Sequence, residues 1–291
     1  MEPLGAWVSG LAATALGGLA YSAGYEVRAY TLREVSVPMM ASGSLRILHL
    51  SDLHMTPAQH KKQQWLRELA HLKPDAVIVT GDFLAHKDSV QPVLDALAPL
   101  ASIPGYFVFG SNDYYAPSFK NPARYLFSDD GKRIHGDDLP WHDLKQGLEA
   151  FGWVDVTHRK VRASINGVDI EFRGVDDAHL NRDDYSKISG EVPENLLGIG
   201  ISHAPYLRVL DRMEADQVDI LFAGHTHGGQ LCIPFYGALV TNCDLDTRRA
   251  KGLHKYGEMW LHVSAGLGTN PYTPVRFACR PEATLVTLTS P

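Results

Sequence analysis

Five segments of the chain place residues that can hold a metal ion directly after an apolar run of strand length. They are Asp52 and His54 after residues 45–50, Asp82 after 76–80, Asn112 and Asp113 after 106–109, His203 after 197–202, and His225 and His227 after 220–223. Carboxylate, imidazole and amide groups are ligands for divalent ions. Because the carboxyl ends of parallel strands share one edge of a sheet, these distant residues should converge. The pattern predicts a two-metal hydrolytic site.

The spacing within two of the segments strengthens this prediction. Asp52 and His54 offer a carboxylate and an imidazole from one loop, and His225 and His227 offer two imidazoles from one turn rich in glycine. The two oxygens of Asp82 can bridge two ions and keep them about 3.5–4 Å apart. Each piece alone has a commoner structural explanation, since a strand-end aspartate often caps a helix and a single histidine is usually only hydrogen-bonded. Their shared position at strand ends favours the metal site.

The elements that must position these residues follow an α/β pattern, in which apolar runs alternate with amphipathic stretches. Strands are predicted at residues 45–50, 76–80, 106–109, 197–202, 220–223, 259–264 and 284–288, with a hairpin of 161–165 and 169–174 around Asn166-Gly167. Helices are predicted at 61–72, 89–100 and 141–151, and through Leu207, Leu210 and Met213. The expected fold class is α/β, with two packed mixed β-sheets flanked by helices and an N-terminal hydrophobic helix.

The motifs Asp52-x-His54, Gly81-Asp82, His203 and Gly224-His225-x-His227 resemble the calcineurin-like metallophosphoesterase superfamily over residues 45–288. The longer string at 224–230 is similar to the branch of YkuE-type phosphoesterases and a class of UDP-diacylglucosamine pyrophosphatases. The resemblance implies two divalent ions, with Mn, Fe or Zn suited to such mixed ligands. It implies hydrolysis of a phosphoester or phosphoanhydride by a water that bridges the ions, with His225 also neutralising charge on the phosphoryl group. The implied ligands are Asp52, His54, Asp82 and His227 for one ion, and Asp82, Asn112, His203 and His225 for the other.

One motif departs from this family. The family has Gly-Asn-His-Asp/Glu at the third strand, whereas this chain has Gly110-Ser111-Asn112-Asp113. An ungapped match places Ser111 at the ligand position; a shift of one residue makes Asn112 the ligand and brings Asp113 near the position of the missing histidine acid. We favour the shift, because an amide oxygen is a better ligand for a hard cation than a neutral hydroxyl. Asn112 and Asp113 are thus the candidates for assisting the leaving group.

The composition of the chain limits the kinds of substrate and binding partner that are expected. The net charge of -6 argues against a stable nucleic-acid partner, and the three cysteines have no CxxC spacing. The expected substrate is a phosphorylated small molecule or a lipid-linked phosphate. The alternatives are a non-catalytic metal-binding module of the same fold, suggested by the missing histidine, and a phosphodiesterase acting on cyclic nucleotides or nucleic acid.

The N-terminal segment, residues 1–37, differs from the domain expected at 38–291. No charged residue occurs from Pro3 to Tyr25, a length that can cross a bilayer as a helix. A membrane anchor is expected, with a glycine-rich helix packed on the domain as the alternative. Arg28 and Arg33 follow the segment and no basic residue precedes it, which favours a cytoplasmic catalytic domain.

The connection at residues 114–139 lacks periodicity and mixes aromatic with basic side chains. Because it leaves directly from a predicted metal-binding loop, it is either a lid over the site or an ordered surface connection.

Overall fold

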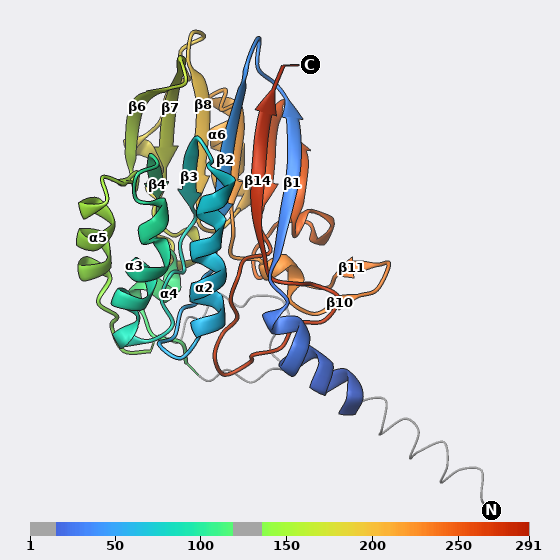
Figure 1. Ribbon diagram of the computed structural model, residues 1–291. Coiled ribbons are helices and arrows are strands. Elements are labelled where there is room, and N and C mark those ends of the chain that lie inside the picture. Colours follow the sequence, from blue (N-terminus) through green and yellow to red (C-terminus); the bar gives the residue numbers. More distant parts are fainter. Residues whose placement is uncertain (1–15, 119–135, 291) are drawn as a thin grey trace, which may run out of the picture.

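The computed structural model describes residues 16–118 and 136–290, and two six-stranded β-sheets form its centre (Figure 1). The first sheet has the order β1-β14-β2-β3-β4-β5. β2 to β5 are parallel, while β14 runs antiparallel to β2 and parallel to β1. The bounds are β1 (Thr31–Pro38), β14 (Glu282–Thr289), β2 (Ser44–Leu50), β3 (Ala76–Val79), β4 (Gly105–Phe107) and β5 (Val154–Asp155).

The second sheet has the order β12-β13-β9-β8-β7-β6, and its four inner strands are parallel. An antiparallel hairpin closes each edge. The bounds are β12 (Gly252–Tyr256), β13 (Met259–Val263), β9 (Ile220–Ala223), β8 (Leu197–Ser202), β7 (Val168–Gly174) and β6 (Arg159–Ile165). A separate small hairpin of β10 (Cys232–Ile233) and β11 (Gly237–Ala238) projects from the body of the domain (Figure 1).

Helices cover the outer faces of both sheets. The helices on the first sheet are α2 (His60–Glu68), α3 (Val90–Leu97) and α5 (Trp141–Ala150), and α6 (Leu207–Ala215) packs on the second. The short α4 (Ser111–Tyr114) follows β4. Single helical turns are η3 (Leu69–Leu72), η4 (Lys87–Ser89), η5 (Ala98–Leu100), η7 (Ala178–Leu180), η8 (Tyr185–Lys187), η9 (His227–Gly229) and η10 (Thr247–Arg249).

The core lies in layers because the inner strands are buried on both faces. In β2, Leu45 and Ile47 face the space between the sheets, whereas Leu48 and Leu50 face the helices. Residues of β7, β8 and β9 meet the first group from the other sheet. The predicted α/β class with two mixed sheets flanked by helices is therefore confirmed.

Four parts of the sheets were not predicted: β1, β5, β12 and the β10–β11 hairpin. β1 is an edge strand in which Arg33 and Glu34 are exposed, so it lacks an apolar run. It pairs with β14 along its whole length, and the first sheet therefore begins at Thr31 rather than after residue 37.

The chain before β1 is helical from residue 16 to 28, ending in η1 (Tyr21–Tyr25) and η2 (Glu26–Arg28). Residues 1–15 lie outside the described part, as do residues 119–135 of the predicted lid. Within the described residues, no helix combines the length and the apolar character needed to cross a membrane. The anchor and the lid remain predictions. The described ends of the lid segment meet each other, where Tyr115 pairs with Asp138.

Truncation of a buried strand residue tests this layering. Ile201 of β8 is fully buried between the sheets. We expect Ile201→Ala to lower the free energy of unfolding by about 2–5 kcal/mol, because it removes buried methyl groups and leaves a cavity. Ile233→Ala makes the same chemical change at a side chain that is 48% exposed and should change it by less than about 0.5 kcal/mol. Equal effects in denaturant titrations would contradict the buried position of Ile201.

Candidate metal centre

The predicted ligands converge at the carboxyl ends of β2, β3, β8 and β9. Five of them have a left-handed backbone, with φ of 50° at Asp52, 39° at His54, 55° at Asp82, 69° at His225 and 50° at His227. Residues other than glycine rarely adopt this conformation, and such residues cluster at functional sites where the surrounding structure holds them. The strand ends therefore turn sharply and aim consecutive side chains into one crevice.

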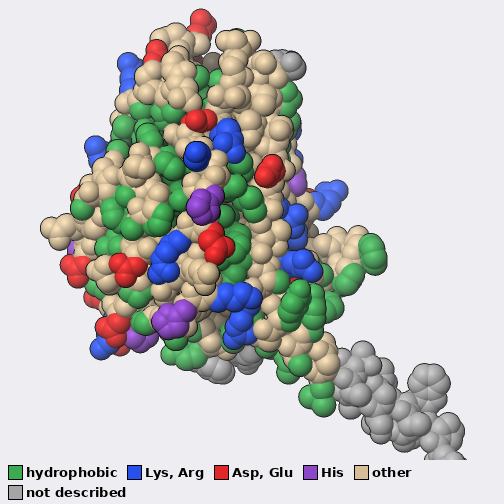
Figure 2. Space-filling view, viewed as in Figure 1, with side chains coloured by type: hydrophobic (Ala, Val, Ile, Leu, Met, Phe, Trp, Pro, Cys, Tyr) green, Lys and Arg blue, Asp and Glu red, His purple; other side chains and the backbone are tan. Residues whose placement is uncertain are grey.

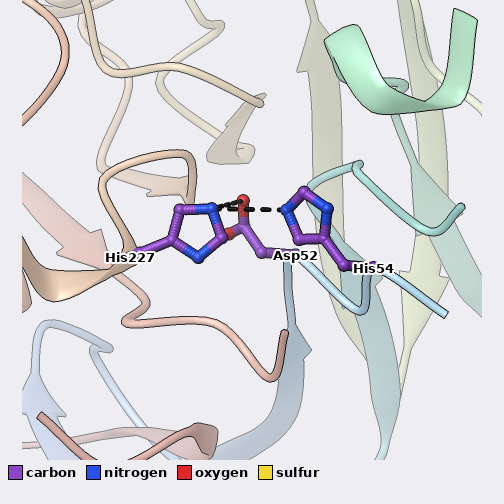
Figure 3. A group of neighbouring side chains, drawn as sticks. All are labelled: Asp52, His54 and His227. Carbon is purple, nitrogen blue, oxygen red and sulfur yellow. Dashed lines mark hydrogen bonds and ion pairs between the residues drawn. The ribbon is translucent and has the colours of Figure 1, made fainter. Parts of the chain in front are cut away.

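Two groups of side chains in this crevice have the geometry of a metal site. In each, one ligand atom per residue lies within 4.8 Å of the others: Asp52, His54 and His227 in the first, and Asp52, Asp82 and His203 in the second. Figure 3 shows the first group, in which the carboxylate of Asp52 and the imidazole of His54, from the loop after β2, and the imidazole of His227, from the loop after β9, point toward one another. The Nε2 atoms of His54 and His227 are 3.3 Å apart. The shared Asp52 joins the two groups into one centre.

Asp82, a member of the second group, also contacts a histidine of the first. Its Oδ2 is 3.3 Å from Nε2 of His54 and 3.5 Å from Nε2 of His203. Asn112 lies on the same carboxylate, since its backbone N–H donates to Oδ1 at 2.8 Å and its side-chain amide donates to Oδ2 at 2.7 Å. Asp82 thus contacts histidines of both groups, as a bridging ligand must.

Backbone carbonyl groups set the orientation of three imidazoles. Nδ1 of His203 bonds to the Thr80 carbonyl at 2.7 Å, Nδ1 of His227 to Gly268 at 3.1 Å, and Nε2 of His225 to Asn242 at 3.1 Å. A ring nitrogen that donates to a carbonyl leaves the opposite nitrogen with its lone pair free for a cation. Nε2 of His203 is buried without a hydrogen-bond partner in the described structure. The donor set therefore fits a cation.

The electrostatics of the crevice agree with this fit. Burial lowers the pKa of His54 to about 4 and that of His227 well below its usual value, so both are neutral imidazoles. Burial alone would also lower the pKa of His203, but the carboxylates of Asp82, Asp177 and Asp52 outweigh it and raise the pKa to about 9. The carboxylates thus give the crevice a negative potential that favours the binding of cations.

Small residues leave the room that these carboxylates occupy. A Cβ on Gly224 would lie 1.8 Å from Oγ of Ser51 and 2.5 Å from Oδ2 of Asp52. A Cβ on Gly110 would lie 2.3 Å from Oδ1 of Asp82. Both glycines are needed for the close approach of the loops rather than for a special backbone angle.

At the third strand end, the surroundings of Asp113 do not suit the predicted role of assisting the leaving group. This side chain is fully buried, and its two oxygens accept hydrogen bonds from the backbone N–H groups of Asp82, Phe83, Leu84 and Gly110. Burial raises its pKa and these donors oppose the rise. With both oxygens bonded to the backbone, Asp113 shapes the loop of Asp82 and has no oxygen directed at a leaving group. Of the two residues considered for the ligand position, Asn112 contacts Asp82 through its side-chain amide. The described structure gives Ser111 no hydrogen bond to Asp82.

His225 lies beside the centre, and its backbone N–H donates to both oxygens of Asp52, at 3.2 and 3.0 Å. Its ring is 5.2 Å from that of His203, between ring centroids. In the described residues it is not part of either group whose ligand atoms meet within 4.8 Å.

Two residues that follow β7 also belong to this environment. The ring of His179 is 4.5 Å from that of His225, between centroids, and its Nδ1 is 3.1 Å from the Tyr206 hydroxyl. Asp177 is fully buried, and its Oδ2 has no hydrogen-bond partner in the described structure. The signal for both residues in the sequence is their position shortly after β7, which pairs in parallel with β8.

A chain of buried hydrogen bonds supports Asp52 from between the sheets. Ser51 Oγ donates to Asp52 Oδ2 at 2.5 Å, and Thr80 Oγ1 donates to Ser51 at 2.6 Å. Nε2 of His49 is 3.0 Å from Thr80 Oγ1, and Nδ1 of His49 is 2.8 Å from Nδ1 of His262 in the second sheet. Because Thr80 donates to Ser51, His49 must donate to Thr80 and His262 must donate to His49. Every donor in the chain therefore points toward the Asp52 carboxylate.

The chain is similar in sequence to known metallophosphoesterases. The family model for calcineurin-like phosphoesterases matches residues 45–229. An uncharacterised metallophosphoesterase of Bacillus subtilis, YkoQ, is 31% identical and aligned over 84% of this chain and 83% of its own. A second from the same organism, YkuE, is 26% identical over 96% and 92%. A dimetal phosphatase structure from Danio rerio has a TM-score of 0.43 and 12% identity, covering 77% of this chain and 88% of its own.

The chain belongs to the calcineurin-like phosphoesterase family. It is a metal-dependent phosphohydrolase. The residues that meet at the strand ends are candidate ligands for its metal.

The hydrogen-bond chain to Asp52 makes a prediction about metal binding. Ser51→Ala removes the hydroxyl that orients the carboxylate, and we expect metal affinity to fall about 10–100-fold. Titration of metal-free protein, followed by metal analysis, measures this. Ser186→Ala is the matched control, because it removes an exposed hydroxyl that donates to the exposed Asp184. Unchanged affinity in Ser51→Ala would show that the chain does not support the ligand.

Proposed function

We propose that this protein hydrolyses a phosphoester or phosphoanhydride at a centre of two divalent ions. The observation that carries the proposal is the pair of ligand groups that share Asp52 and are joined by Asp82. Asp52, His54, Asp82 and His227 would hold one ion, and Asp82, Asn112, His203 and His225 the other. Ions bound there would acidify a shared water and neutralise charge on the phosphoryl oxygens.

The protein residues have separate tasks around that reaction. The loops after β2 and β3 hold the carboxylates, and the carbonyls of Thr80, Gly268 and Asn242 hold three imidazoles in orientation. His225 lies at the margin of the centre beside His179, where it would face the phosphoryl group. His225 and His179 would thus bind and orient the substrate.

We assign the proton for the leaving group to His179 rather than to Asp113. Asp113 is bonded through both oxygens to the backbone, whereas the half-buried His179 lies against His225. Imidazole is the side chain best suited to give up a proton at neutral pH. The role that the family gives to a histidine after the third strand would here be supplied from the end of β7.

The finer proposal concerns the substrate, which we take to be a lipid-linked phosphate. Its support is the charge-free stretch from Pro3 to Tyr25 ahead of the domain. Membrane association through this segment, with the catalytic domain on the cytoplasmic side as Arg28 and Arg33 favour, would bring the centre to lipid phosphates.

The main reaction is tested with Mn²⁺-loaded protein on a chromogenic phosphodiester, a phosphomonoester and pyrophosphate. His203→Ala and His225→Ala should each lower turnover on the order of 100-fold or more, because each removes a proposed ligand. His71→Ala replaces an exposed histidine of η3 and should leave turnover unchanged. Wild-type turnover equal to that of His225→Ala on all three substrates would favour a non-catalytic metal-binding module. Preferred turnover of cyclic nucleotides or nucleic acid would favour the nucleotide phosphodiesterase alternative.

The role of His179 has a test of its own. His179→Gln should lower kcat by about 10²–10⁴-fold on an ester whose leaving alcohol is weakly acidic, and far less on a nitrophenyl ester that needs little protonation. Metal content should stay at the wild-type level. Equal losses on both esters would exclude His179 as the acid.

A further inference from the structure

The large hydrophobic side chains that are exposed lie in three neighbouring segments of the described structure. They are Leu16, Leu19, Tyr21 and Tyr25 in the N-terminal helix, Leu231, Ile233, Phe235, Tyr236 and Leu239 in and beside the β10–β11 hairpin, and Tyr272 and Phe277 in the chain before β14. Figure 2 shows hydrophobic side chains on the projecting hairpin and beside η1, with Lys and Arg side chains next to them. Contiguous apolar surface of this kind marks an interaction site.

The three segments contact one another and therefore form one surface. Leu231 pairs with Phe277 as an isolated bridge, and the Phe277 ring lies 6.5 Å from the Tyr21 ring, edge to face. The Cys279 N–H donates to Glu26 Oε1 at 2.6 Å, which ties the N-terminal helix to the chain before β14. We call this surface the apolar face.

The tip of the hairpin is hard to explain by folding. Phe235 is 111% exposed and Tyr236 is 74% exposed, so neither ring packs on the domain. Phe235 also has a left-handed backbone, with φ of 67°, which favours Gly or Asn over an aromatic residue. A hairpin surrounded by water would gain nothing from a phenylalanine at this position.

A basic pocket opens within the apolar face. It has a volume of about 360 Å³ and is lined by Tyr21, Glu26, Arg33, Lys251, Phe277, Ala278 and Arg280. Arg33 is paired with Glu282, and the carboxylate of Glu26 is buried and bonded to Cys279. Lys251 and Arg280 make no ion pair with a carboxylate within residues 16–118 and 136–290. The pocket is therefore positively charged and bordered by aromatic rings.

We propose that the apolar face docks on an anionic phospholipid bilayer, with Phe235 and Tyr236 inserted among the acyl chains and a lipid phosphate in the basic pocket. Aromatic rings beside basic side chains are typical of residues at the bilayer interface. The charge-free stretch from Pro3 to Tyr25 ends within this same face, so a bilayer also accounts for the sequence that leads into it. A protein partner would not require that stretch.

The proposed docking does not depend on hydrolysis, but it bears on the centre's position. The β10–β11 hairpin begins a few residues after His227, and Lys251 of the pocket reaches Sγ of Cys279 at 3.7 Å. That sulfur is 3.3 Å from the His227 carbonyl. Docking would thus hold the loop of one proposed ligand next to the bilayer surface.

Fluorescence quenching in the full chain tests the insertion. Phe235→Trp, mixed with phosphatidylglycerol-containing vesicles that carry brominated acyl chains, should show quenching beyond that of the wild-type tryptophans. Phe235→Asn keeps the left-handed turn, so its melting temperature should match wild type while its apparent vesicle affinity falls roughly tenfold or more. Phe235→Leu should retain the affinity.

The basic pocket is tested by charge reversal. Arg280→Glu should lower the affinity for anionic vesicles by roughly fivefold or more, the weight of a basic residue near such a surface. Lys61→Glu makes the same change on the exposed side of α2 and should have no effect. Quenching in Phe235→Trp no greater than in wild type, or equal affinities of Arg280→Glu and Lys61→Glu, would overturn the proposal. A shift of oligomeric state in Phe235→Asn without loss of vesicle binding would instead assign the face to a protein contact.

Discussion

Two buried carboxylates in one crevice are the constraint on which the rest of the site depends. Asp52 is fully buried and Asp82 is 2% exposed, so neither can use water to stabilise its charge. The structure meets this cost with backbone donors, through the N–H groups of His225 and Asn112, and with imidazoles on either side. These groups balance part of the negative charge. A pair of cations would complete the balance, which is why the same arrangement that is costly without metal favours metal binding.

The packing of the two sheets serves the same carboxylates. His49 and His262 lie between the sheets, where an unpaired polar group would destabilise the fold. The bond between the two rings and the bond from His49 to Thr80 give partners to both nitrogens of His49 and to Nδ1 of His262, and the final donor, Ser51, is directed at Asp52. Burial lowers the pKa of both histidines, so the pair is neutral and keeps its fixed tautomers. The inter-sheet core thus sets the orientation of a proposed ligand as well as the stability of the domain.

The sequence predicts elements well where one physical signal dominates. The apolar runs of β2, β3, β8 and β9 are buried on both faces, and the residues after them converge because parallel strands end at one edge. Edge strand β1 carries no such run and forms through pairing with β14, which is distant in the sequence. The strands of the small hairpin are two residues long, too short for an apolar run to show. The position of Asp113 was beyond prediction, since four backbone donors from two loops meet only in the folded chain.

Arg276 shows how the surface and the centre are coupled. It is fully buried, and its guanidinium donates to the carbonyls of Ala265, Gly266 and Gly268, with Gly268 at 2.7 Å. The Gly268 carbonyl in turn accepts from Nδ1 of His227. The backbone N–H of Arg276 donates to the Ser22 carbonyl of the N-terminal helix at 3.3 Å. A buried guanidinium keeps its charge and needs all these acceptors. A shift of that helix would therefore move Arg276 and, through the Gly268 carbonyl, change the orientation of the His227 ring. The orientation of a proposed metal ligand therefore depends on the position of the N-terminal helix.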